Sequence, residues 1–162
     1  MQIRYYKEYS RYLNRDMEFK VYGHAGRPIL IFPCQSGRFF DWEDRNMCNL
    51  AAPWIDAGKL QIIAADSIEM QERWYNYVCE ELTPRALEIN REQGPDHMGK
   101  VLVGGASMGA GHAVNLFLRR PDLYNGTIAL SGLYQADMFF KGYMDDLVYR
   151  NSPCDYMRNF PD

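Results

Sequence analysis

The chain has 162 residues, of which 47% are hydrophobic and 24% are charged, and its formal net charge is −3 at pH 7. This length suits one domain with one substantial core, residues 1–162, and the composition argues against a disordered chain. Because the net charge is small and negative and no long run of like charge occurs, we expect neither nucleic acid nor an anionic membrane as a partner.

The first thirty-two residues predict a pair of antiparallel strands followed by a buried strand. Residues 3–9 are rich in strand-favouring tyrosines, and residues 17–22 alternate apolar and charged side chains. Asn14 and Asp16 provide turn chemistry between the two segments. After a break at residues 23–28, residues 29–32 are apolar throughout, which is typical of a strand buried on both faces.

From residue 41 onward, helices and strands are expected to alternate. Helices are predicted over residues 41–56, ending at Gly58, and over residues 75–90, interrupted by Pro84. A third predicted helix follows the serine motif described below and runs to about Arg120. Further buried strands are predicted over residues 60–65, 100–105 and 126–131, a loop over residues 94–96, and a tail without strands over residues 134–162.

This order of elements predicts the fold class. Two antiparallel strands followed by repeated strand–helix–strand units indicate an α/β fold with a mainly parallel sheet and helices on both faces.

The sharpest motif is Gly-Ala-Ser-Met-Gly at residues 105–109, which lies directly after a predicted buried strand and directly before a predicted helix. A GxSxG motif in this setting predicts a nucleophile elbow, in which a strained turn presents the hydroxyl of Ser107 above the sheet. The alternative, a phosphate-binding or dinucleotide-binding turn, has a different glycine spacing. The helix N-terminus beside Ser107 suits a developing oxyanion.

Two backbone N–H groups are needed for an oxyanion hole, and the sequence offers a candidate for each. The first is Met108, the residue after the nucleophile. The second is Gln35, in the loop after the strand at residues 29–32. Cys34 in the same loop is a rival nucleophile, but no histidine partner is recognisable for it, and strand-end cysteines are usually buried and inert.

The compartment is predicted from two features. The N-terminus lacks the apolar core of a signal peptide, and no stretch approaches the ~20 apolar residues of a membrane span. The four cysteines show no metal-binding spacing, which favours free thiols over disulfides or a zinc site. We therefore expect a cytoplasmic protein without a metal or an organic cofactor.

Three segments together give a specific resemblance: GGASMGAGHA at residues 104–113, RRPDLY at residues 119–124 and LSG at residues 130–132. They are similar to the α/β-hydrolase family that contains esterase D (S-formylglutathione hydrolase), enterochelin esterases and mycolyltransferases. Asp66 and Trp74-Tyr75-Asn76 also resemble the segment after the next strand. The loop at residues 33–37 stands where the family has its oxyanion loop, with Pro33 and Cys34 replacing the histidine and first glycine.

The resemblance implies a serine, then an acid, then a histidine in chain order, with the last two after two further strands. The sequence contains neither strand, so the fold is expected to stop before the last strands of the family. Of the three histidines, His24 and His97 lie outside the expected place. His112, in the helix after Ser107, also lies outside it; it is a candidate base, although a packed, hydrogen-bonded histidine is the more usual role at such a position. Asp137 is a candidate acid, although a surface carboxylate is the more usual role there.

Three functions follow from this interpretation. The resemblance implies a hydrolase of small-molecule carboxylic esters or thioesters that forms an acyl-enzyme on Ser107, with Trp74 and Tyr75 as candidate pocket residues. The alternatives are a binding or assembly module of the same fold that has lost the acid and base, and an acyltransferase. An apolar strand at residues 127–130 without a further partner strand becomes the edge of the sheet. Two chains can pair through such an edge and form a homo-oligomer.

Overall fold

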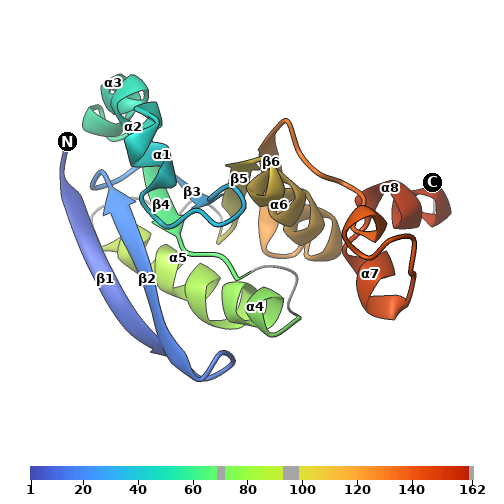
Figure 1. The fold of residues 1–162 in the computed structure, drawn as a ribbon. Coiled ribbons are helices and arrows are strands. Elements are labelled where there is room, and N and C mark those ends of the chain that lie inside the picture. Colours follow the sequence, from blue (N-terminus) through green and yellow to red (C-terminus); the bar gives the residue numbers. More distant parts are fainter. Residues whose placement is uncertain (69–71, 93–98, 161–162) are drawn as a thin grey trace.

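The computed structural model describes residues 1–68, 72–92 and 99–160, and it places six strands in one sheet (Figure 1). The order across the sheet is β1-β2-β4-β3-β5-β6. The strands are β1 (Ile3–Ser10), β2 (Arg15–Tyr22), β3 (Arg27–Phe32), β4 (Leu60–Ala65), β5 (Val101–Ala106) and β6 (Tyr124–Leu130). β1 and β2 are antiparallel, β2 is antiparallel to β4, and β4, β3, β5 and β6 are mutually parallel. The predicted α/β fold class is confirmed.

The connections between the central strands place two chain segments at one edge of the sheet. From β3 the chain crosses to β4 on one side and returns to β5 on the other, so β3 lies between β4 and β5. Loops at the carboxyl ends of parallel strands around such a reversal usually hold the ligand of an open α/β sheet. The loop after β3 and Ser107 after β5 both lie at the carboxyl ends of these parallel strands.

Helical segments cover both faces of the sheet, as expected from strands that are apolar on both sides. On one face, side chains of the sheet pack against α4 (Glu72–Tyr77), η1 (Val78–Leu82), α5 (Thr83–Arg91) and α6 (Met108–Arg119). On the other face, a smaller cluster joins the sheet to α1 (Asp41–Asp44), α2 (Met47–Leu50) and α3 (Ala52–Asp56). Figure 1 shows these two helical groups separated by the sheet.

The single helix predicted over residues 41–56 is wrong, because the segment forms the three short helices α1, α2 and α3. Asn46 adopts a left-handed conformation with φ of 62°, which ends α1 and starts α2. Pro53, which lacks an N–H group, stands in the first turn of α3. Gly58, the predicted stop, has φ of 66°.

Pro84 has a smaller effect than the sequence suggested. The helical path is continuous from Glu72 to Arg91, because Val78–Leu82 form a π-helical turn just before the proline, which then stands at the start of α5. A π-helical turn changes the hydrogen-bonding pattern locally and so accommodates a residue without an N–H group.

The tail contains only short helical segments, as predicted: η2 (Asp137–Phe139), α7 (Asp146–Arg150), α8 (Pro153–Tyr156) and η3 (Met157–Asn159). It lies against α6, where the hydroxyl of Tyr156 donates to Oδ1 of Asn115 at 2.8 Å. β6 ends the sheet, and its side chains Ile128 and Leu130 are 47% and 42% exposed. Association through this edge stays a prediction. Within the described ranges, no helix has the length and apolarity needed to cross a membrane.

A buried amide pair ties α5 to the start of β3. Nδ2 of Asn90 donates to the carbonyl oxygen of Gly26 and to Oε1 of Gln61, both at 2.9 Å, and Nε2 of Gln61 donates to the carbonyl oxygen of Gly23 at 3.3 Å. Both side chains are at most 1% exposed. Removal of one partner therefore leaves buried polar groups unsatisfied.

We predict that Asn90→Ala lowers the free energy of unfolding by about 2 kcal/mol, because the Gly26 carbonyl and the Gln61 amide lose their donor. Urea denaturation followed by circular dichroism measures the change. Asn49→Ala, at an exposed position of α2, is the matched control and is expected to change stability by less than about 0.5 kcal/mol. Equal effects of the two variants would contradict the prediction.

Candidate active site

Ser107 occupies the sharp turn between β5 and α6. Its φ and ψ are 54° and −120°, outside the regions that a non-glycine residue ordinarily adopts. The N–H group of Ser107 donates to the carbonyl oxygen of Leu130 at 2.9 Å, and its own carbonyl oxygen accepts from the N–H of Ala110 at 3.1 Å. The strained residue is thus held from both sides by the ends of β6 and α6, as a nucleophile elbow requires.

The two glycines of the motif are required by close backbone contacts. A Cβ atom at Gly105 would lie 2.5 Å from the carbonyl carbon of Gly109, and one at Gly109 would lie 2.3 Å from the carbonyl oxygen of Phe32 and 2.5 Å from that of Pro33. Real side chains do not tolerate such distances. The N-terminus of α6 is therefore packed directly on the carboxyl end of β3, which brings the loop after β3 beside Ser107.

Within the described ranges, the backbone N–H groups of both predicted oxyanion donors are unpaired. Met108 is the first residue of α6, and the first N–H groups of a helix have no partner inside the helix. Among the described residues, no atom accepts a hydrogen bond from the N–H of Met108 or of Gln35. Their role in an oxyanion hole stays a prediction, but the packing of Gly109 on Pro33 brings the two segments together.

The thiol of Cys34 does not have the properties of a nucleophile. Burial and a hydrogen bond to the carboxylate of Asp41 raise its pKa above the ordinary value, which keeps the thiol protonated at neutral pH. The alternative assignment of Cys34 as the nucleophile is therefore disfavoured relative to Ser107.

His112 is a core residue in this structure. It is 7% exposed, and its ring packs against Trp74 with the ring centroids 4.6 Å apart. Burial lowers the pKa of His112 to about 4, and Nε2 has no hydrogen-bond partner within the described part of the chain. The hydrogen bonds described for this chain include none between His112 and Ser107, so its role as a base stays a prediction without a supporting contact.

The other acid–base candidates lie in different places. His24 is in the turn before β3, at the amino ends of the parallel strands, whereas Ser107 is at their carboxyl ends. His97 and the predicted loop at residues 94–96 lie outside the described residues. Asp137 begins η2 and is partly buried, and its carbonyl oxygen accepts from the N–H of Phe140 at 2.8 Å. Its assignment as the acid stays a prediction.

The two predicted pocket residues, Trp74 and Tyr75, lie on α4. Trp74 is 3% exposed, packs edge-on against Phe32 at 5.0 Å between ring centroids, and donates from Nε1 to the carbonyl oxygen of Asp66 at 3.3 Å. Tyr75 is half-buried beneath the guanidinium of Arg119, 3.7 Å from the centre of its ring. Both side chains thus pack against α6, Trp74 through His112 and Tyr75 through Arg119. A role for either in binding substrate stays a prediction.

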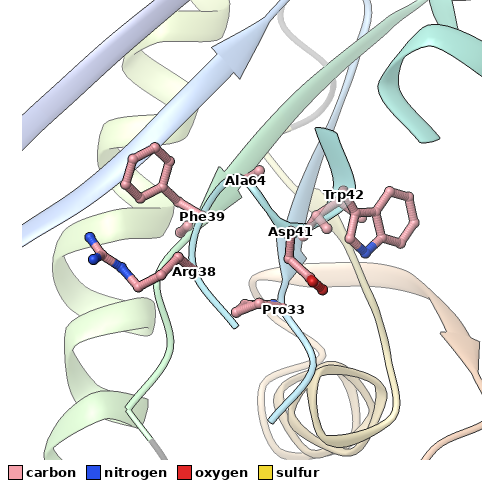
Figure 2. A pocket seen from close by; sticks show the side chains of 8 residues that line it. Pro33, Arg38, Phe39, Asp41, Trp42 and Ala64 are labelled. Carbon is pink, nitrogen blue, oxygen red and sulfur yellow. The ribbon is translucent and has the colours of Figure 1, made fainter. Parts of the chain in front are cut away.

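The charged side chains that hold the loop after β3 were not among the site residues predicted from the sequence. Figure 2 shows Arg38 and Phe39 pointing to one side of this loop and Asp41 to the other. Asp66, one residue beyond β4, accepts from the N–H of Phe39 at 2.8 Å and from Nε of Arg38 at 2.9 Å. The position of Asp66 directly after a predicted strand was the signal in the sequence that could have marked it as a site residue. Its partners Phe39 and Arg38 could not be recognised, because they are 27 and 28 residues away in the chain.

Similarity to known proteins is found at the level of structure. No protein-family model matches the chain, and no curated protein sequence matches it significantly. Among solved structures, a ferulic acid esterase has a TM-score of 0.72 at 16% identity, and an S-formylglutathione hydrolase from Staphylococcus aureus has 0.65 at 13%. A fluorophosphonate-binding serine hydrolase of Staphylococcus aureus has 0.67 at 12%.

These matches cover 99%, 98% and 93% of this chain, respectively, and 72%, 68% and 64% of the matched chains. The structural neighbours are α/β-hydrolase esterases, and they include the types that the sequence motifs resemble. The chain therefore has the α/β-hydrolase fold over most of its length, and it spans about two thirds of the length of these three proteins.

The close approach of Gly109 to the backbone of Phe32 and Pro33 can be tested through stability. Gly109→Ala is expected to lower the free energy of unfolding by about 3 kcal/mol or more, because the new methyl group meets two backbone oxygens that cannot move without shifting β3. Chemical denaturation measures the loss. The control is Gly126→Ala, whose methyl group would meet only the Cδ2 atom of Leu102 at 2.9 Å. A loss below about 1 kcal/mol in Gly109→Ala would contradict the packing described.

The buried His112 generates a pH prediction. Because its pKa falls from the ordinary 6.5 to about 4 on folding, the unfolded chain binds the proton more tightly than the folded one. The stabilisation from the neutral ring is complete above pH 6.5 and is lost as the pH falls towards 4. Between pH 7 and pH 5 the wild type is expected to lose about 2 kcal/mol more stability than His112→Gln. Equal losses in urea titrations of both proteins would refute this prediction.

Proposed function

We propose that this chain carries the nucleophile and the oxyanion hole of a serine esterase that acts on small-molecule carboxylic esters or thioesters. The observation that carries the proposal is the backbone of Ser107, held in a strained conformation at a strand–helix turn, together with N–H groups at Met108 and Gln35 that no described residue accepts from. The fold shared with known esterases supports it.

In the proposed reaction the hydroxyl oxygen of Ser107 attacks the carbonyl carbon of the substrate. The carbonyl oxygen then becomes negatively charged, and the N–H groups of Met108 and Gln35 stabilise it together with the N-terminus of α6. Collapse of the tetrahedral intermediate breaks the bond between the carbonyl carbon and the leaving oxygen or sulfur. The leaving group takes up the proton that the Ser107 hydroxyl gave up and departs as the alcohol or thiol, and an acyl group stays on Ser107. Water completes hydrolysis, whereas attack by another alcohol would make the protein an acyltransferase.

A second candidate function is a non-catalytic binding or assembly module with the same fold. It is favoured by one specific observation: in the part of the chain that the structure describes, no imidazole or carboxylate forms a hydrogen bond with Ser107. Without a base, a serine hydroxyl is a weak nucleophile at neutral pH. The two candidates therefore differ in whether Ser107 reacts.

Covalent labelling of Ser107 distinguishes the two candidates. We predict that a fluorophosphonate adds one adduct to the wild-type protein and none to Ser107→Ala, as measured by intact-protein mass spectrometry. The same two proteins are compared for turnover of 4-nitrophenyl acetate, and loss of turnover in the variant would establish an acyl-transfer role for the serine. A folded wild-type protein that gains no adduct would support the non-catalytic module instead.

A further inference from the structure

We propose that Asp41 and Asp66 are positioning residues of the oxyanion hole, and that their carboxylates hold the two ends of the loop at residues 33–40, here termed the oxyanion loop. This inference rests on the proposed function, because it assigns the two residues a role in presenting the N–H group of Gln35 to the substrate. Neither side chain needs to touch the substrate.

The first clamp is at the amino end of the oxyanion loop. Oδ2 of Asp41 accepts a hydrogen bond from the N–H of Cys34 at 3.1 Å, and Oδ1 accepts from Nε of Arg45 at 3.1 Å. The side chain of Asp41 is 13% exposed, so solvent competes little for these contacts. Burial by itself raises the pKa of Asp41, but the hydrogen bonds from Cys34 and Arg45 outweigh it and lower the pKa, which keeps the carboxylate charged.

The bonded N–H of Cys34 comes immediately before the N–H of Gln35 in the chain. Residues 34–37 form a tight turn, in which the N–H of Gly37 donates to the carbonyl oxygen of Cys34 at 2.9 Å. Ser36 in this turn has φ of 59°, an unusual value for a serine. A Cβ atom at Gly37 would lie 2.9 Å from Cβ of Pro33 and 3.3 Å from Cγ of Asp41. Asp41 thus fixes the N–H group of Cys34, the first residue of the turn, and the proposed donor is the N–H group of the next residue, Gln35.

The second clamp is at the carboxyl end of the loop. The carboxylate of Asp66 accepts from the N–H of Phe39 at 2.8 Å and from Nε of Arg38 at 2.9 Å to Oδ1 and 3.1 Å to Oδ2. Its side chain is 14% exposed. Arg38 also pairs with Glu18 on β2, which extends the clamp into the sheet. Charge-assisted hydrogen bonds of this kind are stronger than neutral ones.

Together the clamps leave the loop few alternative positions. One carboxylate comes from α1, within the same loop–helix segment, and the other comes from the end of β4, the strand beside β3. The N–H groups of Cys34 and Phe39 are both paired, while that of Gln35 between them is not paired with any described residue. An oxyanion donor is effective only when it is held in place before the reaction, and the two carboxylates provide that constraint.

The test compares the second-order rate of fluorophosphonate labelling of Ser107 in the wild type, Asp41→Ala, Asp66→Ala and the control Asp44→Ala. Asp44 lies on the same helix as Asp41, is exposed, and its carboxylate has no hydrogen bond to the described residues. Removing one oxyanion donor costs about 10²–10³ in rate, so a donor that is only loosened is expected to slow labelling by about tenfold or more. Labelling of Asp44→Ala is expected to match the wild type.

Two further measurements separate positioning from general loss of structure. Asp41→Asn and Asp66→Asn keep an acceptor oxygen and are expected to recover most of the labelling rate. Amide hydrogen exchange of residues 34–40 is expected to be several-fold faster in each alanine variant than in the wild type, with the exchange of β3 and β5 unchanged. If an alanine variant does not fold, the asparagine variant carries the test. It loses only the charge-assisted part of the hydrogen bond, so exchange in residues 34–40 is expected to be faster than in the wild type but by less than in an alanine variant, and unchanged exchange would overturn the positioning role.

The outcomes distinguish this inference from the function on which it rests. A wild-type protein that is not labelled at Ser107 refutes the proposed function, and the positioning role with it. A labelled wild type whose Asp41 and Asp66 variants label at the wild-type rate, with unchanged exchange in residues 34–40, leaves the proposed function intact and overturns the positioning role alone.

Discussion

The candidate site depends on the direct contact between the first turn of α6 and the carboxyl end of β3. Only glycine at positions 105 and 109 permits it, because any Cβ atom there would collide with backbone atoms of Phe32, Pro33 or Gly109 itself. The contact forces the abrupt turn at Ser107 and its positive φ. It also brings the loop after β3 beside the helix N-terminus, so one packing constraint brings together the proposed nucleophile and both proposed donors.

The stabilisation around this contact comes from both faces of the sheet. The aromatic ring of Trp74 contacts both Phe32 on β3 and His112 on α6. On the loop side, two carboxylates hold residues 33–40 through backbone N–H groups. The aromatic contacts hold α6 on β3, and the carboxylates hold the loop after β3. The segments beside Ser107 are therefore fixed, and a strained backbone persists only where its surroundings are fixed.

His112 illustrates how position within a helix decides the chemistry of a side chain. It lies in the first two turns of α6, close to Ser107 in sequence, yet its ring is directed into the core against Trp74. Burial disfavours the charged imidazolium and lowers the pKa. A residue that is near the nucleophile in sequence thus contributes packing to the helix that presents it.

Elements with a local pattern of residues were predictable from the sequence. Apolar residues predicted β3, β4, β5 and β6, alternation predicted β2, and the glycine spacing predicted the sharp strand–helix turn at Ser107, because each signal reflects the environment of a few consecutive residues. The helix break at Asn46 and the π-helical turn before Pro84 were not predicted. The contact of His112 with Trp74, the hydrogen bonds of Asp66 and the clamps on the oxyanion loop join residues that are separated in the chain, although a packed position for His112 was one of the alternatives from the sequence. These contacts are visible only in the folded chain, because no local pattern of residues indicates which strands become neighbours and which of their ends lie together.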